Sequence, residues 1–337
     1  MNPSLSTHPD PFREIVEPFA PAFTSLEAFL EEQVSAFEPE VQPLVKYCFG
    51  HSGKRLRPIL VFAMAGESPG ASPDPSVIQA AAIVELVHLA TLVHDDILDG
   101  ADLRHRSQTI VARHGPQVAV LLGDTLFAHA LHLAAGFPDV EVCRSVSMAT
   151  RQVCSGEIAQ TFARGEAPPD MAAYYRIIDL KTAELFSVSA YLGGLLSGFN
   201  PEALAAARAY ARHLGIAYQI YDDAADIFGR EAQAGKTLGT DLATGKFTLP
   251  VLSWIDSHED GEREAALQVL AGNGFSKEAL RERLLRDGVL ERVREAFFEQ
   301  IQSARGALQD IPGASRNASL ERLAGFVESA WNAFSIR

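Results

Sequence analysis

Residues 85–99 read ELVHLATLVHDDILD, an apolar segment that ends in three aspartates. Apolar residues recur here with the helical period, and they continue an apolar stretch that begins near residue 75. On a helix, Asp95 and Asp99 lie about 40° apart around the axis and one turn apart along it, so their side chains project from one face. We therefore expect a helix over residues 75–98 whose C-terminal end presents carboxylates.

A second acidic triplet, Asp222, Asp223 and Asp226, repeats this DDxxD spacing at the end of another apolar stretch. A helix C-terminus is unfavourable for carboxylates, because the helix dipole already places negative potential there. One such triplet is explained as well by a solvated helix end. Two identical triplets favour Mg²⁺ sites instead, since Mg²⁺ prefers oxygen ligands and is commonly held by carboxylates together with substrate phosphates.

The remaining sequence predicts an all-α fold. Helical periodicity occurs in the segments 24–37, 40–49, 55–66, 75–98, 117–135, 138–163, 170–198 and 201–228. Thr24 and Glu27 have capping-box spacing, which predicts a helix start at Thr24. Because the connectors are short, we expect one large bundle of antiparallel helices. We thus predict a flexible segment over residues 1–23 and a single domain over residues 24–337, with a glycine-bearing loop at 229–246 that could act as a lid.

Composition excludes several classes of protein. The net charge is −14, and no Lys/Arg run is long enough to follow a nucleic-acid backbone, so we expect no nucleic-acid partner. The three cysteines, Cys48, Cys143 and Cys154, show no CxxC spacing, which argues against a disulfide framework or a zinc site and favours the cytoplasm. We also expect no signal peptide and no transmembrane segment.

Basic residues are interleaved with the two acidic clusters. They are Lys54, Arg55 and Arg57 at a helix start, Arg104, His105 and Arg106 after the first cluster, Lys181, and Lys236 and Lys246 in the long loop. Each alone is explained by an ordinary surface cation. Their order along the chain favours a site that binds anions such as phosphates.

At this point the chain resembles the trans-prenyltransferases, or polyprenyl synthetases, over roughly residues 50–250. The matching motifs are GKRLRP (53–58), ELVHLATLVHDDILD (85–99), GDTLF (123–127), GEIAQ (156–160), KTAELF (181–186), QIYDDAADIFG (219–229) and GKTLGTDLATGKFTLP (235–250). The resemblance implies an isoprenoid synthase type of helical bundle around a central active-site cavity. Terpene cyclases lack the basic motif and the second DDxxD, di-iron proteins need two Glu-x-x-His motifs, and non-catalytic subunits of two-chain synthases have eroded aspartates.

The resemblance also implies the reaction and the roles of residues. Isopentenyl diphosphate is joined to an allylic diphosphate starter of C5 to C15, in a protein that is expected to be a homodimer. Three Mg²⁺ ions are expected to bind the allylic diphosphate through Asp95, Asp96, Asp99, Asp222, Asp223 and Asp226, assisted by Arg104, Lys181, Lys236 and Lys246. Isopentenyl diphosphate is expected at Lys54, Arg57 and His88, with Thr182 and Gln219 facing the allylic cation.

The chain departs from the family pattern at His105. The family commonly has Arg-Arg-Gly where this chain has Arg104-His105-Arg106, and the second arginine normally contacts isopentenyl diphosphate. Histidine is a weaker and pH-dependent phosphate partner. Either His105 or Arg106 is therefore expected to make this contact.

Product length is expected to depend on the helix that ends at Asp95. In the family, bulky residues four or five positions before the first aspartate stop the product at C15, but here these positions are Thr91 and Ala90, followed one turn back by Val87. We therefore expect an all-trans product longer than C15. Phe127, His129 or Leu131 on the facing helix could instead close the pocket near C20, which leaves geranylgeranyl diphosphate as the alternative product.

Overall fold

The computed structural model describes residues 11–51, 53–66, 73–104, 107–164, 168–229, 241, 244–258 and 277–332. The elements before residue 115 are α1 (Pro11–Val16), η1 (Glu17–Phe19), α2 (Ala20–Val34), α3 (Gln42–Gly50), α4 (Leu56–Ala65), α5 (Pro75–Leu98), β1 (Leu103–Arg104), β2 (Ser107–Gln108) and α6 (Ile110–His114). They are followed by α7 (Pro116–Ala135), α8 (Val140–Phe162), α9 (Met171–Ile178), η2 (Asp179–Ala183), α10 (Glu184–Leu196), α11 (Pro201–Phe228), α14 (Leu249–Asp256), α16 (Lys277–Arg286), α17 (Val289–Ala307), η3 (Leu308–Asp310) and α18 (Ala314–Asn332).

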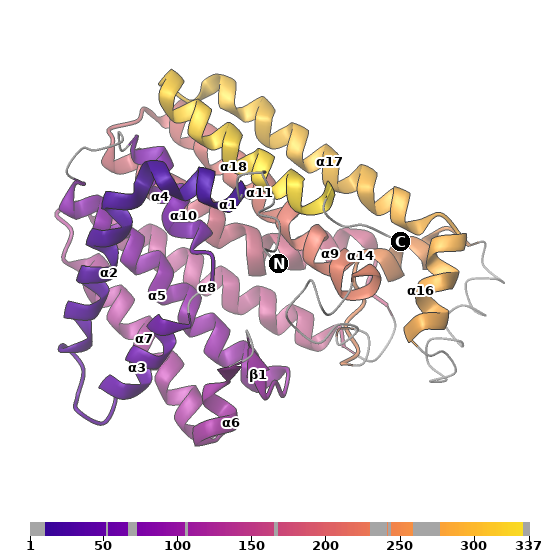
Figure 1. Ribbon diagram of the computed structural model, residues 1–337, viewed down its shortest axis with the longest axis horizontal. Coiled ribbons are helices and arrows are strands. Elements are labelled where there is room, and N and C mark those ends of the chain that lie inside the picture. Colours follow the sequence, from indigo (N-terminus) through magenta and orange to yellow (C-terminus); the bar gives the residue numbers. More distant parts are fainter. Residues whose placement is uncertain are drawn as a thin grey trace, which may run out of the picture.

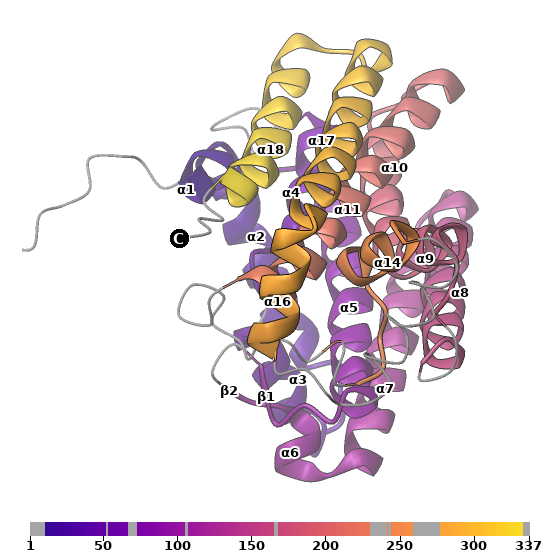
Figure 2. The same ribbon diagram turned by 90° about the vertical axis from the view of Figure 1, so that its right-hand side faces the viewer.

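The predicted all-α bundle is confirmed (Figure 1). Helix α5 lies at its centre and packs against α2, α4, α7 and α10, while α17 and α18 cover α11 on one side (Figure 2). Along α5, Ala80, Ile83 and Leu86 are almost fully buried. Burial all around explains why this helix carries an apolar run rather than a single apolar stripe.

Local signals start the two helices that carry the acidic clusters. Asp74 caps α5 by accepting a hydrogen bond from the backbone N–H of Ser76, and Asn200 caps α11 through the N–H of Ala203. Each cap is followed by a proline, whose fixed φ suits the first helical position. The caps fix where each helix begins, and both helices then run without a break to their aspartates.

The N-terminal prediction is wrong over residues 11–23. These residues are helical, and Ile15, Phe19 and Ala22 are buried in the same core as the later helices. Thr24 does not cap a helix, because it lies inside α2 and its hydroxyl donates to the carbonyl of Ala20. We therefore propose that the single helical domain begins near Pro11 rather than at Thr24.

Two other local features were not predicted. Residues 103–108 contain a short antiparallel pairing of β1 with β2, in which Arg104 pairs with Ser107. The segment expected as one helix over 170–198 is divided by the π-helical turn η2, which holds Lys181 and Thr182. Such turns widen a helix locally and often occur at functional sites.

Among the described residues, α5 and α7 are long and apolar enough to cross a membrane by length and composition alone. In α5 the most apolar part is 72% buried inside the protein, as expected for a core helix. In α7 the corresponding share is only 33%, so this helix exposes apolar surface.

Candidate active site

The first acidic cluster lies at the C-terminal end of α5 and is surrounded by cations. Arg104 donates to Oδ1 of the buried Asp96 through Nε and Nη2, each at 2.8 Å. Nζ of Lys181 lies 3.8 Å from Oδ1 of Asp95. Cationic side chains therefore offset the negative potential of the helix end, as its sequence required.

Asp99 is held by two cations through the same oxygen. Its Oδ1 lies 2.8 Å from Nζ of Lys246 and 3.0 Å from Nη2 of Arg164. Burial alone would raise the pKa of Asp99, but the contact with Lys246 and the charge of Lys181 lower it below its ordinary value. Asp99 is thus ionised at neutral pH, as a metal ligand must be.

Lys181 is positioned by α8. Its Nζ donates to Oε1 of Gln160 at 2.8 Å and forms an ion pair with Glu157. A side chain at Gly156 would meet the backbone N of Lys181 at 2.7 Å, so the close approach of α8 to η2 requires glycine there. Asp95 and Glu157 raise the pKa of Lys181 against the effect of burial, which keeps the ammonium charged.

In the second acidic cluster, Asp223 accepts hydrogen bonds from neutral side chains, unlike the aspartates of the first cluster, which contact cations. Tyr174 donates its hydroxyl to Oδ2 of Asp223 at 2.6 Å, and Gln219 donates its amide to Oδ1 at 2.8 Å. Thr182 in turn donates to Oε1 of Gln219 at 2.8 Å. Burial raises the pKa of Asp223 to about 7, and the negative charge of Asp241 acts in the same direction.

A chain of contacts connects the two clusters. Oδ2 of Asp226 accepts the backbone N–H of Asp241 at 3.3 Å, and Oδ1 of Asp241 lies 3.7 Å from Nζ of Lys246. Lys246 also pairs with Asp99 of the first cluster. The start of the segment leading into α14 therefore joins the ends of α5 and α11.

The predicted isopentenyl diphosphate residues lie around the start of α4 and on α5. Burial lowers the pKa of Arg57 to about 10, and its guanidinium lies 4.8 Å from the ring centre of Phe186. Burial and the charge of Arg57 also lower the pKa of His88 well below its ordinary value, so His88 is neutral at pH 7. Lys54 is exposed, with Nζ 5.2 Å from the ring centre of Phe326 on α18.

The predicted chain-length residues line one side of α5. Val87 and Ala90 are almost fully buried, whereas Thr91 is partly exposed and donates its hydroxyl to the carbonyl of His88 at 2.6 Å. On the facing helix α7, His129 contacts Gln33 of α2 at 3.1 Å. His105, Arg106 and Lys236 lie outside the described residues.

Sequence reasoning missed several residues of this site. Glu157 and Gln160 belong to the quoted motif GEIAQ, which could have indicated them. Asp241 likewise belongs to the quoted motif GKTLGTDLATGKFTLP. Nothing in the local sequence indicated Arg164 or Tyr174, because each meets its aspartate only through the packing of another segment.

The donor set fits Mg²⁺ bound together with a substrate. No group of three or more His, Cys, Asp or Glu side chains forms a ready metal site within the part of the chain that the structure describes. Mg²⁺ does not require such a cage, because it is usually held by one or two carboxylates, water and substrate phosphates. Both acidic clusters match that pattern, because they offer carboxylate oxygens as ligands. Besides burial, the negative charges of Asp241 and Asp222 raise the pKa of Asp223, so a metal cation beside it would be favourable.

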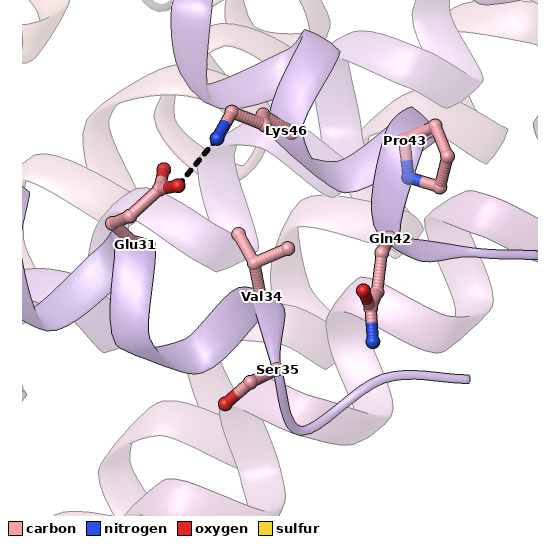
Figure 3. A pocket seen from close by; sticks show the side chains of 6 residues that line it. All are labelled: Glu31, Val34, Ser35, Gln42, Pro43 and Lys46. Atoms are coloured by element: carbon pink, nitrogen blue, oxygen red, sulfur yellow. Dashed lines mark hydrogen bonds and ion pairs between the residues drawn. The ribbon is translucent and has the colours of Figure 1, made fainter. Parts of the chain in front are cut away.

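Two surface cavities among the described residues lie away from this site. One of about 440 Å³ is formed between α2 and α3, where Glu31 and Lys46 form an ion pair across it (Figure 3). It contains no residue of either acidic cluster. We therefore assign it no role in the chemistry.

Comparison with known proteins agrees with this geometry. The polyprenyl synthetase family model matches residues 38–287. The all-trans-nonaprenyl-diphosphate synthase (geranyl-diphosphate specific) of Rhodobacter capsulatus is 30% identical over 92% of this chain and 95% of that protein. A (2E,6E)-farnesyl diphosphate synthase of Mycobacterium tuberculosis is 36% identical over 70% of each chain.

Solved structures give the same result. The crystal structure of a decaprenyl diphosphate synthase from Rhodobacter capsulatus superimposes with a TM-score of 0.86 at 29% identity, covering 95% of this chain and 99% of that one. The residues that the family model matches, 38–287, include both acidic clusters. This chain belongs to the polyprenyl synthetase family of prenyltransferases.

Proposed function

We propose that this protein condenses isopentenyl diphosphate with an allylic diphosphate of C5 to C15 and releases diphosphate. The observation that carries the proposal is the pair of DDxxD clusters connected through Asp241 and Lys246, with Lys181 and Arg104 beside them. Carboxylates and cations in one place suit a metal-bound diphosphate, which needs both.

Bound Mg²⁺ would supply Lewis-acid stabilisation of the departing diphosphate and would be held by the aspartates of both clusters. Asp96 and Asp223 are each engaged by hydrogen-bond donors, which suits them to positioning their neighbours as well as to binding. Lys181 and Lys246 are charged and lie against the first cluster, so they can transfer their contacts to diphosphate oxygens. Their positive charge stabilises the leaving group as its bond to carbon breaks.

The site supplies dipoles rather than a nucleophile to the reacting carbons. The C–O bond of the allylic diphosphate breaks, a bond forms between the allylic C1 and C4 of isopentenyl diphosphate, and a proton leaves C2. Gln219 is fixed at both ends, by Thr182 and by Asp223, so its amide dipole is held in one orientation. Neither Thr182 nor Gln219 is a base at neutral pH, so we assign the proton to the departing diphosphate.

We further propose that the product is all-trans and longer than C15. Thr91, Ala90 and Val87 are small, and the last two are buried in α5, so no aromatic side chain interrupts this face near Asp95. One isoprene unit extends about one helical turn, roughly 5 Å. The nonaprenyl and decaprenyl synthases among the similar proteins support a long product, while the farnesyl synthase is the counter-example.

Product analysis tests the function and the chain length together. The purified protein is incubated with Mg²⁺, labelled isopentenyl diphosphate and C5, C10, C15 or C20 starters, and the dephosphorylated products are sized. We expect a main product longer than C20. A main product of C20 would support geranylgeranyl diphosphate synthesis instead, and a main product of C15 or no condensation would refute the proposal.

We also propose that the protein is a cytoplasmic homodimer. Of the eight large apolar side chains exposed among the described residues, six lie on α7 and α8: Val120, Leu121, Val140, Met148, Ile158 and Phe162. A second copy of the chain would cover this apolar surface. Light scattering should give the mass of a dimer, and Leu121→Glu should reduce it to a monomer, whereas Leu103→Glu, at an exposed position outside these helices, should not.

A further inference from the structure

Glu85 is a buried carboxylate that the mechanism above does not use. It lies on α5 one turn before His88 and is only 1% exposed. Neither of its carboxylate oxygens has a hydrogen-bond partner in the described structure. Burying a charged group is costly unless it is paired, so the surroundings of Glu85 should explain why a carboxylate stands there.

Two arginines of the motif GKRLRP are its charged neighbours. Nε of Arg55 lies 3.9 Å from Oε1 of Glu85, close enough for an ion pair but too far for a hydrogen bond. Among the groups that raise the pKa of Arg57 and so keep its guanidinium charged, Glu85 has the largest effect. Its Nε is buried without a hydrogen-bond partner in the described residues, so the guanidinium retains a donor for a ligand.

The backbone beside these arginines is strained. Arg55 has φ 50° and ψ 43°, and it is the one residue other than glycine with positive φ in the described ranges. This left-handed conformation costs a side-chain-bearing residue about 1–2 kcal/mol. Such strain persists only where surrounding contacts enforce it, and here the side chain of Arg55 reaches the carbonyl of Phe49 and the buried Glu85. Its other partner, Glu27 of α2, is largely exposed.

A negative charge in this position opposes the binding of an anion. Glu85 reduces the net positive charge of a site that must attract a diphosphate. If it served only as a counter-charge, its removal would strengthen diphosphate binding. A carboxylate is useful here only if the orientation that it gives to the two guanidiniums outweighs this repulsion.

We propose that Glu85 is a positioning residue for isopentenyl diphosphate. From its buried position Glu85 orients the side chains of Arg55 and Arg57, so that Arg57 presents its unpartnered Nε–H to the diphosphate. This inference rests on the proposed function, which places isopentenyl diphosphate at Arg57. It gives the left-handed Arg55 a purpose, because this residue sets the direction in which α4 starts and hence the place of Arg57. Glu85 acts through the arginines and does not touch the substrate.

The test compares Glu85→Gln, Glu85→Asp and the control Glu27→Gln. Glu85→Gln keeps the size of the side chain but removes the charge, and Glu27→Gln removes the exposed carboxylate partner of the same Arg55. We expect Glu85→Gln to raise the KM for isopentenyl diphosphate at least about tenfold, the scale on which loss of an outer-shell partner acts. The KM for the allylic diphosphate should stay within about twofold, and Glu27→Gln should leave both values unchanged.

Calorimetric titration of isopentenyl diphosphate, without metal or allylic substrate, provides a readout independent of turnover. Its affinity should fall in Glu85→Gln and fall less in Glu85→Asp, which keeps the charge. An unchanged or stronger affinity in Glu85→Gln would overturn the inference. If Glu85→Gln does not fold, the titration of Glu85→Asp is the test. An unchanged affinity of Glu85→Asp for isopentenyl diphosphate would likewise overturn the inference. Failure of the wild-type protein to bind isopentenyl diphosphate or to condense it would refute the proposed function instead.

Discussion

Tyr174 makes a buried hydrogen bond to the second acidic cluster. It donates a hydrogen bond of 2.6 Å to Oδ2 of Asp223, and both residues are buried. Burial and the charge of Asp241 raise the pKa of Asp223, and the hydrogen bond from Tyr174 partly opposes them; the resulting pKa is about 7. In Tyr174→Phe the ring remains and the donor is lost, so the pKa of Asp223 should rise further and the carboxylate should be less ionised at neutral pH.

The size of the effect follows from the hydrogen bond. A hydrogen bond to a charged group contributes about 1.5–3 kcal/mol, and about 1.4 kcal/mol corresponds to a tenfold change in the ionisation constant. If this energy applies only to the ionised carboxylate, the midpoint of the acid limb of activity should move up by about 1–2 pH units. The assay is the pH dependence of kcat/KM for the allylic diphosphate, which reports groups of the free enzyme.

The control is Tyr175→Phe. Tyr175 packs against Tyr174 with ring centres 5.3 Å apart but is only half-buried, and its hydroxyl does not bind Asp223. Its pH profile should match that of the wild type. A Tyr174→Phe profile that superimposes on the wild type, or that moves to lower pH, would refute the assignment of this ionisation to Asp223.

The other predictions concern the metal, the substrates and stability. Asp95→Ala or Asp222→Ala should lower turnover at least about 100-fold, and activity should require Mg²⁺; near-normal turnover in either variant or after chelation would contradict the mechanism. Thr91→Phe should shorten the product toward C15 with the first condensation retained, and an unchanged product distribution would place the tail elsewhere. His105→Arg should lower the KM for isopentenyl diphosphate, and the wild-type KM should rise between about pH 6 and 8 as the imidazole loses its charge; equal values in both proteins would assign the contact to another group. Because Asp223 ionises near pH 7 when folded but near pH 4 when unfolded, the metal-free protein should lose up to about 4 kcal/mol of stability as pH rises through this window. Urea unfolding should show this loss in the wild type and not in Asp223→Asn, and equal slopes would contradict it.

The sequence predicted the helical bundle and the acidic clusters because the signals involved are local. Apolar periodicity acts within one or two helical turns, and it places α5 and α11 with little reference to the rest of the chain. The caps that the structure shows at Asp74 and Asn200 are equally local. The DDxxD spacing lies within a single turn for the same reason. The α1 helix escaped prediction because Pro9, Pro11 and Pro18 in and around it are typical of a loop, although Ile15 is buried and α1 packs against α18 at the far end of the chain.

Only the tertiary structure decided which group meets each aspartate. Arg164 reaches Asp99 across 65 residues of sequence, and Tyr174 reaches Asp223 across 49. Arginine and tyrosine at those positions are equally compatible with a solvent-exposed helix surface, so composition and periodicity carry no information about these contacts. Charge pairing depends on distances of a few ångströms between segments, and those distances are set by how the helices pack rather than by any local pattern.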